Sequence, residues 1–375
     1  MTLFLFLKQI TDMLYPYHFL DYGMVVMAVI ALVYQVALVR PDVRKHVKVA
    51  DVAILLLSLL LTIQFLRNPA STYSVYVKVL SAFLMYFVGR MYYERLQECS
   101  GALAASGYVV VYANLIHRLV VFGTQFFHVT NAEGDFYYND TDLVYGLLIA
   151  LIFIAMYGRN SLIKGITMFF VIPVLVLCSD AGVQKVLFIA IYVLIVIYCL
   201  EKLGVPRKTA NGILITAIVG LAFLIVMMLL PVFTGLNNSV FKIFAGDWIS
   251  FRQLELRYDD WKHIWLEIRQ AGILEKAFGL SLGLHLSNQY ITVLYSFGIV
   301  GCIITVVYAL DVLRRIFKIE DRKTYYVMVL LTILFMGSSI LNNCMEFTQC
   351  SWFFMMFGGM VVSAGRIEEE ARDVQ

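Results

Sequence analysis

Charged residues are scarce in this sequence. Asp, Glu, Lys and Arg make up 15% of the 375 residues, against roughly 25% in an ordinary soluble domain. Hydrophobic residues make up 61% and the mean hydropathy is +0.81, which excludes a soluble globular protein. Proline is limited to six residues while long apolar runs recur along the chain, so intrinsic disorder and a collagen-like helix are excluded as well. The composition is that of a polytopic membrane protein.

Signatures of several enzyme classes are also missing. The sequence has no P-loop, dinucleotide fingerprint, HExxH or GxSxG motif, which argues against an ATP-driven pump, a zinc protease and a serine hydrolase. The six cysteines lack metal-ligand spacing, and the net charge of +3 is too small for a nucleic-acid binder. We therefore expect no nucleic-acid partner and no metal held by these cysteines, and any energy or reactive bond must come from the substrate or from an ion gradient. Cys344 and Cys350 flank one connection, where we favour free thiols over a disulfide.

The apolar runs predict an all-α transmembrane bundle of about 11–12 spans, forming a single integral membrane domain over residues 1–375. A helix needs about 20 residues to cross a bilayer, so the shorter runs must extend into their polar flanks. We interpret residues 1–19 as an interfacial amphipathic helix, with a twelfth crossing or a re-entrant segment as the alternative. The predicted spans are residues 20–39, 50–66, 73–92, 101–123, 143–158, 165–178, 183–200, 212–232, 289–310, 325–340 and 350–365.

Lys and Arg concentrate in alternate connections, which predicts the orientation, because basic loops are retained on the cytoplasmic side. The basic segments are residues 40–48, 90–95, 159–164, 202–208, 314–323 and 366–372. We therefore expect a multi-pass protein of the cytoplasmic (inner) membrane with a cytoplasmic C-terminus. The extracytoplasmic side then carries a polar loop at 124–142 and a large loop at 233–288. Apolar residues recur at helical spacing in the large loop, so we expect one or two surface helices there.

Three polar features stand out. His117 and Arg118 lie in the fourth predicted span, where a charge is costly unless it meets a partner or water; the alternative is that Arg118 snorkels to the interface. The loop NAEGDFYYNDTD sets Asn139 and Asp140 beside aromatic residues, which suits sugar binding, a divalent ion held by oxygen ligands, or a simple solvated cap. Basic residues also gather on the extracytoplasmic side, where they suit phosphate groups or lipid headgroups. These are Lys185, Lys242, Arg252, Arg257, Lys262, Arg269 and Lys276.

The large loop carries a motif series that resembles a known family. RYDDW contains Arg257 and Trp261, FGLSLG follows at residues 278–283, and SNQYITVLYSFGIVG at residues 287–301. This series resembles the O-antigen polymerase and ligase superfamily, in which an R-x-x-x-W element opens a loop helix, a G-x-G-type turn follows, and a His-Asn-x-Tyr-Leu segment leads into a helix ending in Gly-Ile-Ile-Gly. The matching residues are Arg257, Trp261, Asn288, Tyr290, Gly298 and Gly301.

Weaker similarities to the same family at residues 137–152 and 177–192 extend the resemblance to roughly half the chain. Two positions depart from the pattern: Ser287 stands where His is usual, and Lys185 is the base nearest the Ser-Arg element. These departures fit the divergent polymerases of capsule and exopolysaccharide pathways.

The resemblance implies a GT-C-like membrane glycosyltransferase acting on undecaprenyl-diphosphate-linked oligosaccharide at the outer face of the membrane. A sugar hydroxyl of one repeat unit would attack the anomeric carbon of the growing glycan, and undecaprenyl diphosphate would leave. Because this leaving group is not a nucleotide, the resemblance implies no bound cofactor and no metal. On this reading Arg257 stabilises the departing diphosphate, with Lys185 and Arg118 as supporting cations. His285 is a candidate general base. Candidate substrate-binding residues are Trp261, Asn288, Gln289, Asn139 and Asp140.

Other functions stay open. An O-antigen ligase is an alternative within the same enzyme class, and the sequence separates it poorly from a polymerase. A flippase or transporter for lipid-linked glycans predicts paired charges inside several spans and two related halves, whereas the spans are nearly free of charge and the loops are asymmetric. A non-catalytic envelope scaffold would leave the loop motifs unexplained. A flippase and a chain-length regulator are candidate protein partners of a polymerase, and membrane lipid surrounds it in any case.

Overall fold

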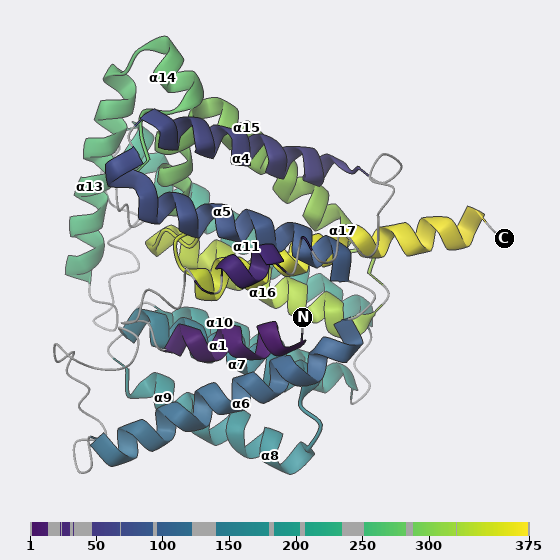
Figure 1. Ribbon diagram of the computed structural model, residues 1–375. Coiled ribbons are helices and arrows are strands. Elements are labelled where there is room, and N and C mark those ends of the chain that lie inside the picture. Colours follow the sequence, from purple (N-terminus) through teal and green to yellow (C-terminus); the bar gives the residue numbers. More distant parts are fainter. Residues whose placement is uncertain are drawn as a thin grey trace.

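In the computed structural model, all regular secondary structure among the described residues is helical (Figure 1). The described residues are 2–13, 23, 25–30, 33, 47–67, 69–92, 96–121, 140–179, 184–202, 207–234, 251–282, 288–319 and 321–373. The bundle contains α1 (Thr2–Met13), α4 (Val49–Arg67), α5 (Pro69–Tyr92), α6 (Leu96–Val121), α7 (Asp140–Tyr157), α8 (Ser161–Ile166), the π-helical segment η3 (Thr167–Val171), α9 (Ile172–Leu177), α10 (Gln184–Lys202), α11 (Arg207–Thr234), α15 (Gln289–Ile316), α16 (Arg322–Leu341) and α17 (Thr348–Asp373). The large loop contains α13 (Phe251–Gln270) and α14 (Ile273–Phe278).

Five helices within the described part of the chain are long and apolar enough to cross a membrane. They are Val49–Arg67, Thr72–Met91, Cys99–His117, Gln289–Ile316 and Arg322–Ile340. Shorter apolar helices cover Leu143–Tyr157, Ser161–Leu177 and Gln184–Cys199. Every predicted span from 50–66 onward coincides with a helix or a helix series, whereas most of 20–39 lies outside the described residues. The chain is thus a helical membrane protein.

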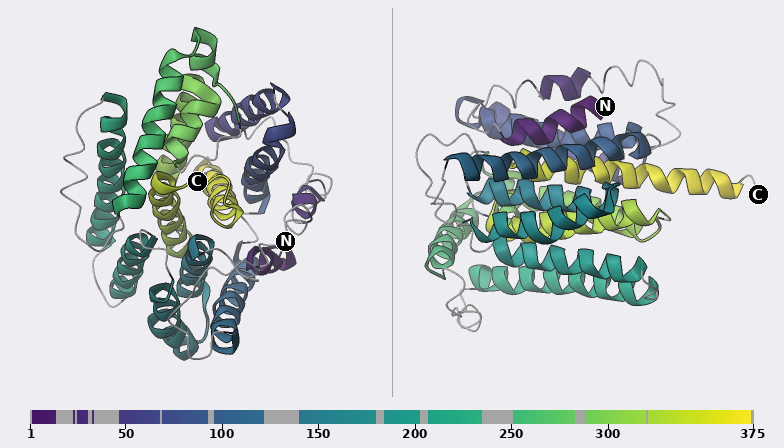
Figure 2. Two further views of the ribbon diagram at one scale, coloured as in Figure 1. Left: turned by 90° about the vertical axis from the view of Figure 1, so that its left-hand side faces the viewer. Right: turned by 90° about the horizontal axis from the view of Figure 1, so that it is seen from below.

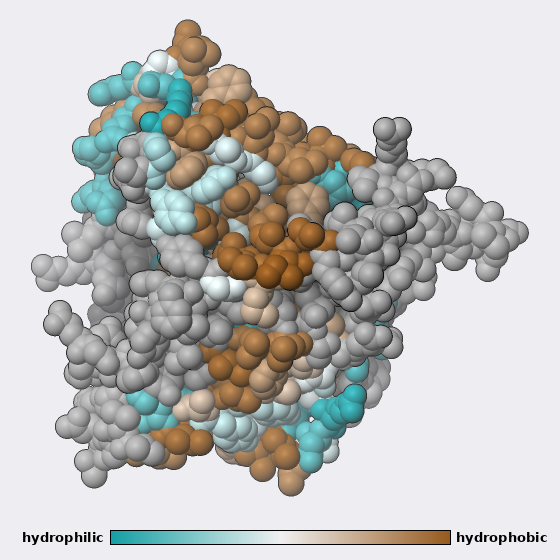
Figure 3. Space-filling view, viewed as in Figure 1, coloured by the Kyte–Doolittle hydropathy of each residue, from teal (hydrophilic) through white to brown (hydrophobic). Residues whose placement is uncertain are grey.

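Large apolar side chains cover the outer surface of the bundle. On α4, Leu55 and Leu59 are each 56% exposed and face away from the core. A helix that is apolar on all sides is stable either in a large core or in a membrane. The same pattern continues over α15, and Figure 3 shows hydrophobic residues spread across this face. These surfaces therefore face lipid.

Helix α7 forms the centre of one half of the bundle. It is surrounded by α6, α10, α16 and α17, and almost every residue from Leu143 to Tyr157 is buried. Its Phe153 ring lies 5.1 Å from Phe353 and 5.8 Å from Phe357 of α17, centroid to centroid. In the other half, α17 packs along α5 and α15 packs along α4 (Figure 2).

Helix α1 lies within the bundle, so its prediction as an interfacial helix is wrong. It packs against α6, α7 and α17 and runs beside them (Figure 1). Lys8 and Gln9 are only 2% and 4% exposed. The Lys8 ammonium donates to Thr348 Oγ1 (3.3 Å) and lies 4.6 Å from the Trp352 ring centroid. The described helix has 12 residues and the residues that follow it lie outside the described part of the chain, so the twelfth crossing and the re-entrant segment both stay predictions.

The two helices of the large loop lie at one end of the bundle. Figure 1 shows α13 across the left-hand end, with α14 beside it, and the C-terminus projecting from the opposite end. The prediction of one or two helices in this loop is confirmed. The end of α6 and the starts of α7 and α10 lie at the same end as α13 (Figure 1). Segments predicted to share one side of the membrane therefore share one end of the bundle.

Candidate functional site

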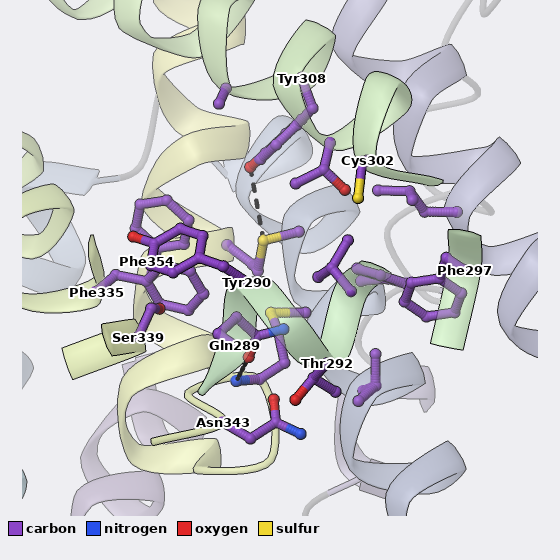
Figure 4. Close-up of a pocket in the computed structure, with 18 of the residues that line it drawn as sticks. Gln289, Tyr290, Thr292, Phe297, Cys302, Tyr308, Phe335, Ser339, Asn343 and Phe354 are labelled. Atoms are coloured by element: carbon purple, nitrogen blue, oxygen red, sulfur yellow. Dashed lines mark hydrogen bonds between the residues drawn. The ribbon is translucent and has the colours of Figure 1, made fainter. Parts of the chain in front are cut away.

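A cavity of about 340 Å³ runs along α15, between α4, α5, α16 and α17 (Figure 4). Its α15 lining extends from Gln289 to Leu313, almost the whole length of that helix. Most of the lining is apolar, and no Asp, Glu, Lys, Arg or His is among the described residues that line it. The volume lies within the usual range for ligand pockets, about 300–1,000 Å³. An elongated apolar cavity inside a membrane protein suits a lipid chain.

Helix α15 is interrupted where it borders this cavity. Gly298 has φ 64° and ψ −165°, a conformation essentially restricted to glycine. The α14 end packs into the interruption, so a Cβ on Gly298 would lie 2.5 Å from the backbone of Ala277. Gly279, on the facing turn, also has a positive φ of 96°. A Cβ on Gly279 would lie 2.2 Å from the Ser296 carbonyl oxygen, so this position also requires glycine. These two glycines let the loop turn and the broken helix meet backbone to backbone.

Hydrogen bonds fix this turn from two sides. On one side, Leu280 N–H donates to the Tyr295 carbonyl of α15 (2.8 Å). On the other side, Gln64 of α4 donates from Nε2 to the Phe278 carbonyl (2.6 Å), and Arg67 donates to the Gly279 carbonyl (3.2 Å). Backbone polar groups at membrane depth must be satisfied within the protein. The turn is therefore fixed in place, and Leu282 at its end contributes to the wall of the cavity.

The start of α15 is tied to the connection between α16 and α17. Asn288 is the N-cap: its Oδ1 accepts from Ile291 N–H (3.1 Å) and its Nδ2 donates to the Ile340 carbonyl of α16 (2.8 Å). The Oε1 of Gln289 accepts from Met345 N–H (2.8 Å), while its side chain lines the cavity (Figure 4). Asn288 is fully buried and already bonded, so it positions α15. Gln289 remains available to a ligand through its amide nitrogen.

Helix α13 is anchored on the bundle through Trp261. This side chain is 0% exposed and packs with Ile264, Ile268 and Ile291 in a cluster separate from the main core. Near it, the ring of Trp265 lies 4.8 Å from Phe233 of α11. Trp261 does not line the cavity. The tryptophan of the R-x-x-x-W element therefore holds the loop helix in place, and its role as a substrate ligand stays a prediction.

The other predicted site residues lie around the same end of the bundle. Lys185, at the start of α10, donates to the Leu177 carbonyl at the end of α9 (3.3 Å) and does not line the cavity. Asn139 and His285 lie outside the described residues, as do the side chains of Arg118, Asp140 and Arg257, whose backbones belong to α6, α7 and α13. Of the candidate site residues, the cavity lining includes Gln289.

A buried ion pair at the opposite end of the bundle was missed by sequence reasoning. Arg90 donates to both carboxylate oxygens of Asp51, at 2.9 and 3.1 Å, and to Ser363 Oγ (2.8 Å). The Tyr86 hydroxyl donates to Asp51 as well (2.6 Å), and its ring lies 5.9 Å from Tyr308, which lines the cavity. The charge pattern indicated only that Arg90 belongs to a cytoplasmic connection. A signal for the pair was present, because consecutive antiparallel spans place the start of one beside the end of the next.

Comparison with known proteins gives no family assignment. No family model matches the chain, and none of the curated proteins matches it.

Proposed function

We propose that this protein polymerises undecaprenyl-diphosphate-linked oligosaccharide repeat units into a surface polysaccharide, such as O-antigen, capsule or exopolysaccharide. The main support for this proposal is that segments of the loop motifs border the cavity. Gln289 belongs to the SNQYITVLYSFGIVG segment and also lines the cavity, and the FGLSLG segment provides the turn that bounds it. A lipid-chain cavity that ends beside a basic, polar loop suits a substrate with an apolar tail and an anionic, glycosylated head.

The proposed reaction takes place at the surface of the bundle. A hydroxyl of the terminal sugar on one lipid-linked unit attacks the anomeric carbon of the other, and undecaprenyl diphosphate leaves with the electron pair of the cleaved bond. The described lining of the cavity carries no cation, so the diphosphate needs charges from outside it. Arg257 is our first choice, with Lys185 and Arg118 in support, because a planar guanidinium matches phosphate oxygens. His285, three residues before Asn288, is the candidate base that takes the hydroxyl proton.

The membrane arrangement belongs to the same proposal. The end of the bundle that carries α13 would face the outside of the cytoplasmic membrane, and the C-terminus would be cytoplasmic, as the distribution of Lys and Arg predicts. The architecture would be GT-C-like, with loop helices over a transmembrane bundle. A flippase would deliver the substrate and a chain-length regulator would be a partner. No cofactor is required because the substrate carries its own leaving group.

The test uses the glycan length profile of cells that lack the gene. They are complemented with wild type, Arg257→Ala, Arg257→Lys or Arg269→Ala, and the amount of each variant in the membrane is checked. Removing a donor that stabilises developing charge costs about 100-fold or more in rate, so Arg257→Ala should leave single lipid-linked repeats at the outer face. Arg257→Lys should restore little, because it loses the bidentate fork. Arg269 is exposed on the same helix outside the motif, and its variant should restore long chains.

Other accumulated products would assign the chain differently. Long lipid-linked chains that are not transferred to their final acceptor would indicate a ligase. Lipid-linked units retained at the inner face would indicate a transporter. Two features are typical of transporters: the broken helix α15 and the buried charges of Asp51 and Arg90. However, this pair is bonded to Tyr86 and Ser363, and the loop turn fills the interruption. Both features therefore have structural roles, and polymerisation is the better-supported function.

A further inference from the structure

Two buried polar groups at the loop-side end of the cavity lack partners in the described part of the chain. Ser339 is 1% exposed and Asn343 is 5% exposed, and both line the cavity. Neither Ser339 Oγ nor Asn343 Oδ1 has a hydrogen-bond partner there. The amide nitrogen of Asn343 is already used, since it donates to Glu346. A buried polar group without a partner costs free energy, so a partner supplied by a ligand is expected.

A third polar group belongs to the same end. Because Gln289 Oε1 accepts from Met345 N–H, its Nε2 is a donor whose orientation is fixed. Gln289 lines the cavity, and Figure 4 shows Gln289, Ser339 and Asn343 around one end of it. The three side chains offer one donor, one acceptor and one hydroxyl that serves as either.

We infer that this end of the cavity binds the uncharged hydroxyl group of a long-chain lipid. A hydroxyl donates one hydrogen bond and accepts two, so it can donate to Asn343 and accept from both Gln289 and Ser339. A phosphate is a poor match, because an ionised phosphate oxygen cannot donate to Asn343 and no cation lines this end among the described residues. The apolar remainder of the cavity takes the lipid chain. This inference rests on the proposed function in treating the cavity as a lipid site, and it places the diphosphate outside the cavity.

Direct binding tests the inference without the reaction. The full-length protein in phosphatidylcholine nanodiscs is cross-linked with a photoreactive farnesol, and unlabelled farnesol, farnesyl methyl ether and farnesyl phosphate compete. Farnesol should protect the cavity residues at the lowest concentration. The ether cannot donate to Asn343 and should be about 3- to 10-fold weaker, the usual effect of one hydrogen bond. The phosphate should be weaker than farnesol by at least the same factor. Ether or phosphate competing as well as farnesol would overturn the inference.

A matched pair of serines provides the variants. Ser339→Ala removes a hydroxyl that has no partner in the described part of the protein, so the fold should be preserved, and farnesol binding should weaken about 3- to 10-fold. Ser338 is equally buried on the same helix but does not line the cavity, so Ser338→Ala should bind as wild type does. Equal binding by the two variants would contradict a polar contact at Ser339. Failure of the proposed polymerisation would appear in the glycan profile and leave these binding results unchanged.

Discussion

Replacing Gly298 with alanine tests the backbone contact on which the loop-side end of the cavity depends. The φ/ψ values of Gly298 lie in a region that costs a residue with a Cβ about 1–3 kcal/mol. The added Cβ would also lie 2.5 Å from the carbonyl carbon and oxygen of Ala277 and 2.6 Å from the nitrogen of Gly279. These are backbone atoms that cannot rotate away, and overpacking of this kind costs about 1–3 kcal/mol. Together the two costs predict a loss of about 2–6 kcal/mol in folding free energy.

The measurement is unfolding of the purified protein by SDS in mixed micelles. Gly298→Ala should unfold at a clearly lower SDS fraction than wild type. Gly220→Ala is the control, because Gly220 lies within α11 and the added methyl group would meet nothing within 4 Å; this variant should be unchanged or up to about 1 kcal/mol more stable. If Gly298→Ala unfolds at the same SDS fraction as wild type, the backbones of the loop turn and of α15 are not in contact, and the turn does not contribute to the wall of the cavity.

Two further substitutions test other parts of the bundle by the same SDS unfolding. Asp51→Asn should cost about 3–5 kcal/mol, because it leaves the Arg90 guanidinium buried without its counter-charge. The exposed Asp259→Asn is the control, and equal stability of the two variants would show that the pair is not buried. Trp261→Ala should cost about 3–5 kcal/mol of local packing and make trypsin cut within α13 faster than in wild type, whereas unchanged cleavage would mean that another contact holds this helix.

The positions of the transmembrane helices could be predicted because their physical cause is local. A run of apolar residues long enough for a bilayer forms a helix whatever its neighbours are. The helix over Phe251–Gln270 was predictable for a similar reason, since Trp261, Ile264 and Ile268 recur on one face and that face is buried. In both cases the signal lies within the segment itself.

The errors and omissions concern contacts between distant segments. Lys8 and Gln9 give α1 the pattern of an interfacial helix, but Thr348 and Trp352 of α17 provide partners within the bundle that α1 alone does not indicate. Asn288 belongs to a segment that resembles a family motif, and the structure adds that both of its polar atoms are used in positioning α15; its role as a substrate ligand stays a prediction. The sequence motif contains no information about the contact with α16, because Ile340, which accepts from Asn288, lies far away along the chain.

The two ends of the cavity differ in a way that gives it a direction. Near the end bordered by Tyr308, the charges of Asp51 and Arg90 neutralise each other and are bonded to Tyr86 and Ser363. A polar ligand group gains little there, because it would have to displace bonds that already exist. At the loop-side end, Ser339 and Asn343 are buried with their bonding capacity unused among the described residues. A lipid alcohol entering the cavity therefore gains the hydrogen bonds of Ser339 and Asn343 only when its hydroxyl lies at the loop-side end.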